Sequence, residues 1–192
     1  MSLPVNEVLE IIRTEQDANK AWEKILILCQ DTAPSELWDA LLKPSIERDI
    51  LEATEWLTSQ LSILSGTKGI YFGLDTLNMD GGSGTNIEIG GTAACDVDQD
   101  DFDWVYTDLQ YGSNHLIYGL YHLHSIYSQP QWKKGFSFSD YILFLTYSGI
   151  ILGQAFVRLT TQRTLLSVWG FHDGDLFVLG RKSPTGFEFI CK

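Results

Sequence analysis

The chain has 192 residues, of which 44% are hydrophobic and 12% aromatic, so it can bury a substantial core and is not a disordered acidic tail. Its formal net charge is −12 at pH 7, which argues against binding to nucleic acids or to anionic membrane surfaces, because both require a basic surface. We therefore expect no nucleic-acid partner and no membrane partner, and fast association with basic macromolecules.

The first third of the sequence predicts helices. Apolar residues recur at helical spacing, and a longer helix begins after Ser45 as its cap and ends near Leu64. Gly66 follows at the position where helices often end on a glycine. The shorter helices are expected over residues 4–12, 17–29 and 35–43, with Pro44 ending the last.

Strand patterns begin at Gly69. Residues 70–74 and 86–93 predict two strands of a hairpin around the glycine-rich loop 78–85, and residues 104–107 predict a third strand. Helical periodicity returns over 113–127, and the C-terminus predicts three further strands at 165–171, 176–180 and 187–191.

The most apolar stretch runs from Tyr141 to Val157. It is about 17 residues long and contains several polar residues, whereas a membrane-spanning helix needs about 20 apolar residues. We therefore expect a buried helix that begins at Ser139 or Asp140. Together these elements predict a single α+β domain over 1–192, with an N-terminal helical segment, then antiparallel strands with two further helices and a C-terminal β-meander. A helical subdomain over 1–66 is the alternative.

The cysteines indicate the compartment. Cys29, Cys95 and Cys191 are odd in number, far apart and without metal-binding spacing, so we expect buried or half-buried free thiols in a reducing cytoplasm. The N-terminal residues lack the pattern of a signal peptide, which agrees with a cytoplasmic protein.

The charge is concentrated in the middle of the chain. Residues 69–132 contain no Lys or Arg and nine acids, and five of these acids fall within 96–103. Such clustering is unfavourable unless something positive lies nearby, so the segment predicts a basic partner, a bound cation or a solvated loop. The charged candidates for partner binding are Asp96, Asp98, Asp100, Asp101, Asp103 and Asp108.

Four aromatic residues, Phe102, Trp104, Tyr106 and Tyr111, interleave with these acids. Trp104, Tyr106 and Tyr111 are candidate anchors for a partner, because interfaces favour Trp, Tyr and complementary charges. The alternative is that the same rings are core residues of a strand.

Cation and catalytic motifs are incomplete. An EF-hand alignment that starts at Asp96 places Asp101 where glycine belongs and Thr107 where the bidentate glutamate belongs. The glycine-rich segment 81–85 lacks the ending of a P-loop and the last glycine of a nucleophile elbow. We therefore predict no catalytic residue, metal or cofactor, while a dispersed active site and a calcium site of another type stay open.

A pattern of pieces extends over 68–157. Helices are followed by the run Lys68-Gly69-Ile70-Tyr71-Phe72-Gly73, a glycine-rich turn and an Asp-rich segment that closes with Asp103-Trp104. A helix comes next, and then the helix beginning Ser139-Asp140-Tyr141-Ile142-Leu143. This pattern resembles bacterial immunity proteins, the cytoplasmic partners of polymorphic toxins. The resemblance implies a non-enzymatic inhibitor that binds a cognate toxin domain and blocks its active site or substrate channel. Nuclease toxins are commonly basic, which would agree with the acidic segment.

Three functions therefore stand as hypotheses. The first is a cytoplasmic immunity or inhibitor protein that neutralises a basic, nuclease-like toxin domain. The second is an enzyme of another family with a carboxylate or cation site in the same segment, and the third is a non-catalytic adaptor subunit. The sequence does not determine the oligomeric state.

Overall fold

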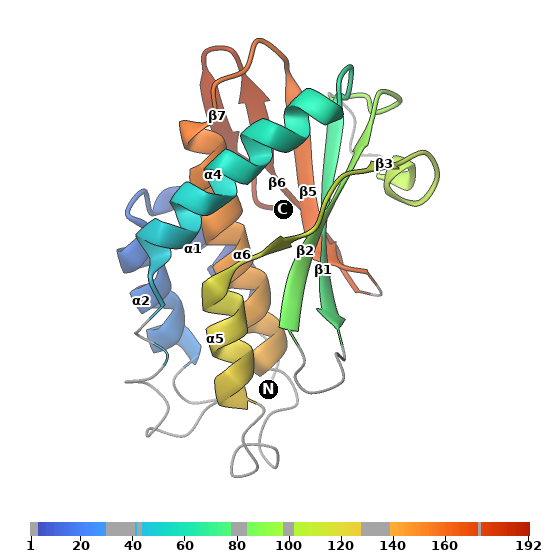
Figure 1. Ribbon diagram of the computed structural model, residues 1–192. Coiled ribbons are helices and arrows are strands. Elements are labelled where there is room, and N and C mark those ends of the chain that lie inside the picture. The colour runs from blue at the N-terminus through green and yellow to red at the C-terminus, as the bar shows by residue number, and fades with distance from the viewer. Residues whose placement is uncertain are drawn as a thin grey trace.

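Helices and one mixed sheet make up the fold (Figure 1). The computed structural model describes residues 4–29, 41, 44–77, 84–97, 102–127, 139–172 and 174–192. The helices are α1 (Val5–Thr14), α2 (Ala18–Cys29), α4 (Ile46–Ile63), α5 (Tyr118–Tyr127) and α6 (Ser139–Arg158), with a 3₁₀ turn, η3, at Asp103–Tyr106. The strands are β1 (Gly69–Leu77), β2 (Gly84–Thr92), β3 (Gln110–Tyr111), β4 (His115–Leu116), β5 (Leu165–Phe171), β6 (Leu176–Ser183) and β7 (Gly186–Phe189).

The α+β class is confirmed, but the sheet is mixed. Its order is β3-β2-β1-β5-β6-β7, and β4 also pairs with β2. The hairpin β1–β2 and the C-terminal meander are antiparallel, as predicted, whereas β1 and β5 are parallel. A parallel pair needs a long crossover connection, and here the chain between β2 and β5, which includes α5 and α6, supplies it.

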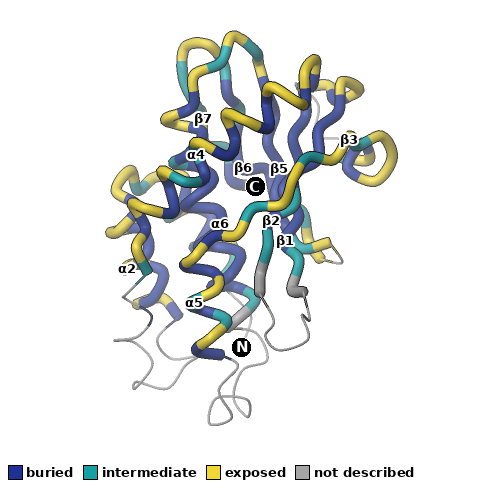
Figure 2. The backbone as a smooth tube through the Cα atoms, viewed as in Figure 1, coloured by how far each residue is buried: buried dark blue, intermediate teal, exposed yellow. Residues whose placement is uncertain are grey.

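The helix α6 lies at the centre of the helical layer. It contacts α1, α2, α4 and α5, and also β5, β6 and β7 (Figure 1). The stretch Tyr141–Arg158 is long and apolar enough to span a membrane, but 78% of it is buried inside the fold. It is therefore a core helix, and its dark backbone in Figure 2 lies behind more exposed elements.

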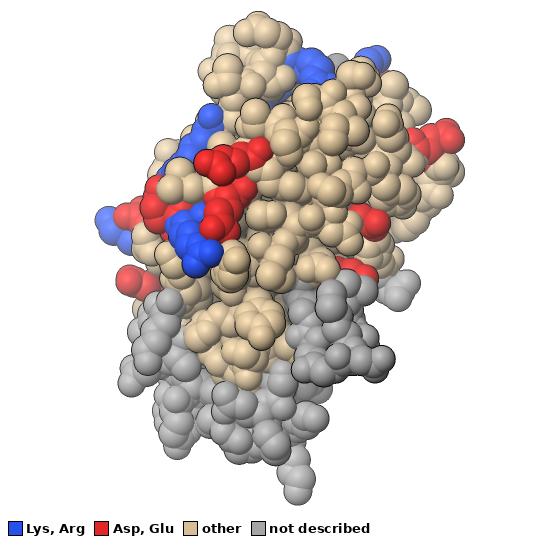
Figure 3. All heavy atoms as spheres, viewed as in Figure 1, with Lys and Arg blue, Asp and Glu red and all other residues tan. Residues whose placement is uncertain are grey.

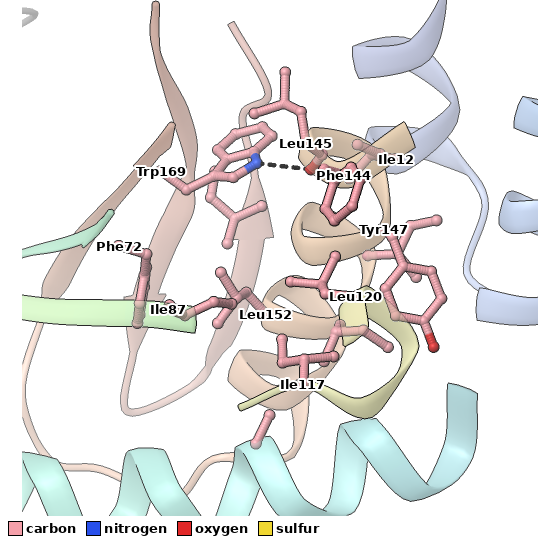
Figure 4. Close-up of a cluster of buried hydrophobic side chains, with 14 of the residues drawn as sticks. Ile12, Phe72, Ile87, Ile117, Leu120, Phe144, Leu145, Tyr147, Leu152 and Trp169 are labelled. Carbon is pink, nitrogen blue, oxygen red and sulfur yellow. Dashed lines mark hydrogen bonds between the residues drawn. The ribbon is translucent and has the colours of Figure 1, made fainter. Parts of the chain in front are cut away.

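One hydrophobic core joins the helices to one face of the sheet (Figure 4). Phe72 and Ile87 point from β1 and β2 toward α6, where they approach Leu152. Trp169 of β5 donates a hydrogen bond from Nε1 to the carbonyl of Leu145 at 3.1 Å, so the indole is buried with its polar atom satisfied. The core includes residues from α1 to the C-terminus, so the helices before Gly66 share it with the sheet.

The predicted helix over 113–127 begins later than expected. Residues His115 and Leu116 are the strand β4, which pairs with Asn86 and Ile87 of β2, and the helix starts at Tyr118. The free edge of β2 offers hydrogen bonds to this segment, and these outweigh its helical pattern.

The predicted strand over 104–107 is wrong. Residues Asp103–Tyr106 form η3, in which the neighbouring side chains of Trp104 and Val105 are both buried. A strand would send neighbouring side chains to opposite faces, so it could not bury both on one surface.

Two details of the helix ends also differ. Ser45 occupies the position before α4 but makes no side-chain capping hydrogen bond. Gly66 has the positive φ of +85° expected of a glycine after a helix. The helix expected over 35–43 lies outside the described residues except for Leu41, which is buried and accepts a hydrogen bond from Trp22.

Candidate functional site

The described parts of the segment that carries the acids lie on the face of the sheet that the helices leave uncovered. Along β1, Ile70 and Phe72 face the helices, so Tyr71 faces the other side. There Tyr71 packs in a second, smaller cluster that includes Trp104 and Val105, together with strand residues. The remaining buried members of this cluster are Cys95, Leu166, Val168 and Val178.

Two glycines make room for this segment. A Cβ atom at Gly69 would lie 2.6 Å from the Cβ of Cys95 and 3.0 Å from the ring of Trp104. A Cβ atom at Gly90 would lie 2.8 Å from the side chain of Leu109. The contacts with Cys95 and Leu109 are shorter than real Cβ contacts, and the one with Trp104 is very tight, so side chains at these positions would push the segment away from the sheet.

Hydrogen bonds hold the beginning of the segment. The guanidinium of Arg181, on β6, donates to the carbonyl of Val97, and the backbone N–H of Ala94 donates to Oγ1 of Thr92 at 3.1 Å. The acidic segment is therefore attached to the sheet at its start, and the cluster around Trp104 attaches it again further along.

The predicted partner-binding residues fall into three groups. Tyr106 and Tyr111 are exposed, at 68% and 55%. Trp104 is 7% exposed and belongs to the second hydrophobic cluster, although it lies on a 3₁₀ turn and not on a strand. Because Trp104 holds the segment on the sheet, it is not available as a partner anchor. The described acids Asp96, Asp103 and Asp108 are exposed, and Asp98, Asp100 and Asp101 lie outside the described residues.

The segment that carries these exposed acids contains no Lys or Arg of its own. In Figure 3 red atoms stand at the right edge of the molecule, where β3 and η3 lie in Figure 1, and no blue atoms adjoin them in this view. The surface can therefore attract a cationic group electrostatically.

A pocket opens beside the start of the segment. Its volume is about 630 Å³, and it is lined by residues 66–68, 93–97 and 163–164. Arg163 is its most strongly basic side chain, but its guanidinium donates to the carbonyls of Leu64 and Leu61 at 2.8 and 2.6 Å. The guanidinium of Arg163 therefore supplies hydrogen bonds to carbonyl groups at the end of α4 and is not directed at a ligand.

The thiol in the same pocket is not activated. Burial, together with the negative charge of Asp96, raises the pKa of Cys95 to about 11. At neutral pH the group is a neutral thiol, which is a poor nucleophile. Cys29 and Cys191 are likewise buried, with pKa values raised to about 11 and about 12.

A histidine–carboxylate pair, which sequence reasoning missed, lies on the same face of the sheet. Nε2 of His172 is 3.1 Å from the carboxylate of Glu88, and the ring packs edge-on against Tyr71. Gly73 makes this possible, because a Cβ atom there would lie 2.7 Å from the imidazole. Strand alternation places Glu88 on this face opposite Ile87 and Ile89, but the approach of His172 depends on tertiary structure.

The described residues do not complete a catalytic or metal-binding set around this pair. Within the described ranges, no three His, Cys, Asp or Glu side chains come together to hold a metal ion. The aspartates of the cation hypothesis at 98, 100 and 101 lie outside those ranges, so that hypothesis remains a prediction.

Comparisons with known proteins add no identity. The chain matches no protein-family model, no curated protein and no solved structure.

Proposed function

We propose that this chain is a cytoplasmic, non-catalytic inhibitor that binds and neutralises a basic protein, in particular a nuclease-like toxin domain, as an immunity protein does. The observation that carries the proposal is the exposed acidic-aromatic surface formed by Asp96, Asp103, Tyr106, Asp108 and Tyr111 on a segment attached to the sheet. We include Asp98, Asp100 and Asp101 in it on the sequence pattern alone.

The attachment of this segment supports the proposal. Trp104 is buried against the sheet, while Tyr106, two residues later, is exposed on the same short turn. A side chain presented on a fixed backbone loses less conformational entropy on binding than one on a free loop, so affinity improves. Tyrosine rings also supply large contact area with few rotatable bonds.

The charge pattern supports the kind of partner. Nucleases bind polyanions through basic grooves, and an acidic surface would be attracted to such a groove and would exclude the substrate by occupying it. Carboxylates accept paired hydrogen bonds from arginine, and exposed tyrosine rings accept cations on their faces.

The first experiment is affinity capture from the source cell's lysate at low salt, followed by elution with a salt gradient. A basic protein held in stoichiometric amount and released at high salt would support the proposal, and its activity would be assayed with and without the chain. Absence of any stoichiometric basic partner would contradict it.

Association kinetics test the role of the acids. A variant with Asp98, Asp100, Asp101 and Asp103 changed to Asn is expected to bind the captured protein at least about tenfold more slowly, with weaker salt dependence. The control changes four exposed acids of α1, α2 and β7 to Gln, so the net charge is the same; these are Glu7, Glu10, Glu23 and Glu188. Equal rates for the two variants would remove the specific role of the segment.

The enzyme and adaptor hypotheses predict other results. Specific uptake of Ca²⁺, Mg²⁺ or Mn²⁺, lost when Asp98 and Asp100 become Asn, would favour a cation-assisted enzyme, and titration calorimetry measures it. Binding to a neutral or acidic protein that is insensitive to salt would favour an adaptor.

A further inference from the structure

A short segment covers one edge of the sheet. Residues 112–119 include β4 and run along β2 between β3 and α5 (Figure 1), and we call this segment the strap. The N–H of Gly112 donates to the carbonyl of Ile89 at 2.9 Å, and β4 pairs with Asn86 and Ile87. An exposed strand edge can pair with another chain, so the strap protects β2 as long as it stays attached.

The helix α4 holds both ends of the strap. Ser113 donates from its N–H to Oε1 of Gln60 at 2.9 Å, and its carbonyl accepts from Nε1 of Trp56 at 3.0 Å. The N–H of Gly119 donates to the carboxyl of Asp49 at 2.7 Å. The strap therefore depends on contacts with a helix as well as with the sheet.

His115 is the histidine in the middle of the strap. Its ring stacks on the indole of Trp56, with the ring centres 4.9 Å apart and the planes 16° from parallel. Nε2 of His115 is buried, and within the described part of the chain it has no hydrogen-bond partner. A neutral imidazole can leave one nitrogen as an unused acceptor, whereas an imidazolium carries a charge and has two N–H donors. A buried charge or donor without a partner is costly, so the attached strap favours the neutral form.

Two carboxylates of α4 also act on this ring. Burial lowers the pKa of His115, and the charges of Glu52 and Asp49 oppose this effect without cancelling it. Each carboxylate has a nearer partner: Glu52 pairs with Arg48 at 2.9 Å, and Asp49 accepts a hydrogen bond from the hydroxyl of Tyr147 at 2.8 Å. Their attraction therefore does not offset the cost of burying a charged ring.

β2 and α5 are the other described elements next to His115, and they place no carboxylate beside it. Ile87 of β2 is its apolar partner in the sheet, and Glu88, the next residue, faces the opposite side of the sheet. On α5 the phenol ring of Tyr118 lies 4.0 Å from the guanidinium of Arg48. A proton on His115 would therefore add a charge that the attached strap does not neutralise.

We propose that the strap is an acid-sensitive switch: uptake of a proton by His115 detaches the strap from β2 and α4 and exposes the edge of β2 and the indole of Trp56. Histidine changes its charge between pH 5 and 8, so a mild acidification is sufficient. The inference goes beyond the proposed function and does not depend on it, because every group involved belongs to the chain itself. Tyr111 directly precedes the strap, so detachment would also release one ring of the acidic-aromatic surface.

The size of the effect follows from the protonation of His115 in the two states. In the detached strap the imidazole has the ordinary histidine pKa of about 6.5, so at pH 5.5 about ten rings are protonated for each neutral one. When the attached strap holds the neutral ring, the equilibrium constant for detachment rises about tenfold from pH 7.5 to 5.5. Acid acts on Asp49 in the opposite sense, because burial raises its pKa. A variant is therefore needed to isolate the effect of the histidine.

Hydrogen exchange followed by mass spectrometry at pH 7.5 and 5.5 tests the switch, with rates corrected for the pH dependence of free amides. We expect peptides that cover 84–92 and 110–119 to lose protection about fivefold to tenfold at pH 5.5. The helix α2 is the internal control, because it contains no histidine. The variant His115→Phe keeps an aromatic ring on Trp56 and takes up no proton, so its protection should change less than twofold.

Three outcomes would overturn the inference. The first is equal or stronger protection of these peptides at pH 5.5 in the wild-type chain, since stronger protection would mean that the carboxylates of α4 bind the imidazolium. The second is the same loss of protection in His115→Phe. The third is an equal loss in α2, because the whole fold would then open and not the strap.

A titration of the wild-type chain by NMR gives a second readout that needs no variant. The chemical shift of the His115 ring is followed against pH, and its midpoint is expected below the ordinary histidine value. The amide signals of residues 112–119 should shift with the same midpoint. A midpoint of the ring at or above the ordinary value would overturn the inference.

Discussion

The hydroxyl of Tyr147 is expected to be one of the most important single polar groups for stability. The side chain is fully buried, and its hydroxyl donates to the carboxyl of Asp49 at 2.8 Å. Within the described part of the chain, the other oxygen of Asp49 has no hydrogen-bond partner. The change Tyr147→Phe therefore leaves the carboxyl with one bond, from the N–H of Gly119.

The cost follows from that lost bond. Removing one partner of a buried hydrogen bond costs about 1–3 kcal/mol, and bonds to charged groups are in the upper part of that range. The phenyl ring keeps the packing of the tyrosine, so no large cavity adds to the cost. We expect the free energy of unfolding to fall by about 2 kcal/mol, and Tm to fall by roughly 4–8 °C for a chain of this size.

Urea unfolding at pH 7, followed by tryptophan fluorescence and by circular dichroism, measures the change. The matched control is Tyr121→Phe, which removes an exposed hydroxyl from the adjacent helix and is expected to change stability by less than about 0.5 kcal/mol. If the free energy of unfolding falls by the same small amount in both variants, the hydrogen bonds of Asp49 do not hold α4, α5 and α6 together.

Three further predictions concern the remaining buried groups. Gly69→Ala is expected to destabilise the fold by about 1–3 kcal/mol and to shift the fluorescence emission of the displaced Trp104 to longer wavelength. The control is Gly186→Ala, because no atom lies within 4 Å of the new Cβ. It should leave the stability and the emission wavelength unchanged. Burial raises the pKa of Asp49 in the folded protein. As pH rises above about 4, the carboxyl loses its proton in the unfolded chain before it does so in the folded protein. The free energy of unfolding therefore falls as pH rises from about 4 through the folded pKa. Asp49→Asn removes this slope, and urea unfolding of both proteins from pH 4 to 8 would show parallel curves if the reasoning is wrong. The three buried thiols should react with a disulfide reagent at pH 8 far more slowly in the folded protein than in guanidinium; rapid reaction of any one would contradict its burial.

Local patterns were sufficient for much of the fold. The helix over 139–158, the hairpin of β1 and β2 and the C-terminal meander follow from hydrophobic periodicity and from turn residues, which act between neighbours in the sequence. The parallel pairing of β1 with β5 could not be predicted in this way, because it depends on where a crossover of more than 70 residues returns to the sheet.

Part of the candidate site is likewise determined by the sequence, and part of it by the tertiary structure. The absence of Lys and Arg over 69–132 and the clustering of the acids are properties of the sequence by itself. Tertiary structure decided that Trp104 is buried while Tyr106 is exposed, since the open face of the sheet accepts an indole over Gly69. It also brought His172 to Glu88, and Asp49 to Gly119 and Tyr147, across 70 or more residues. The free energy of burial and of long-range hydrogen bonds selects such contacts, and these terms have no signature in the local sequence.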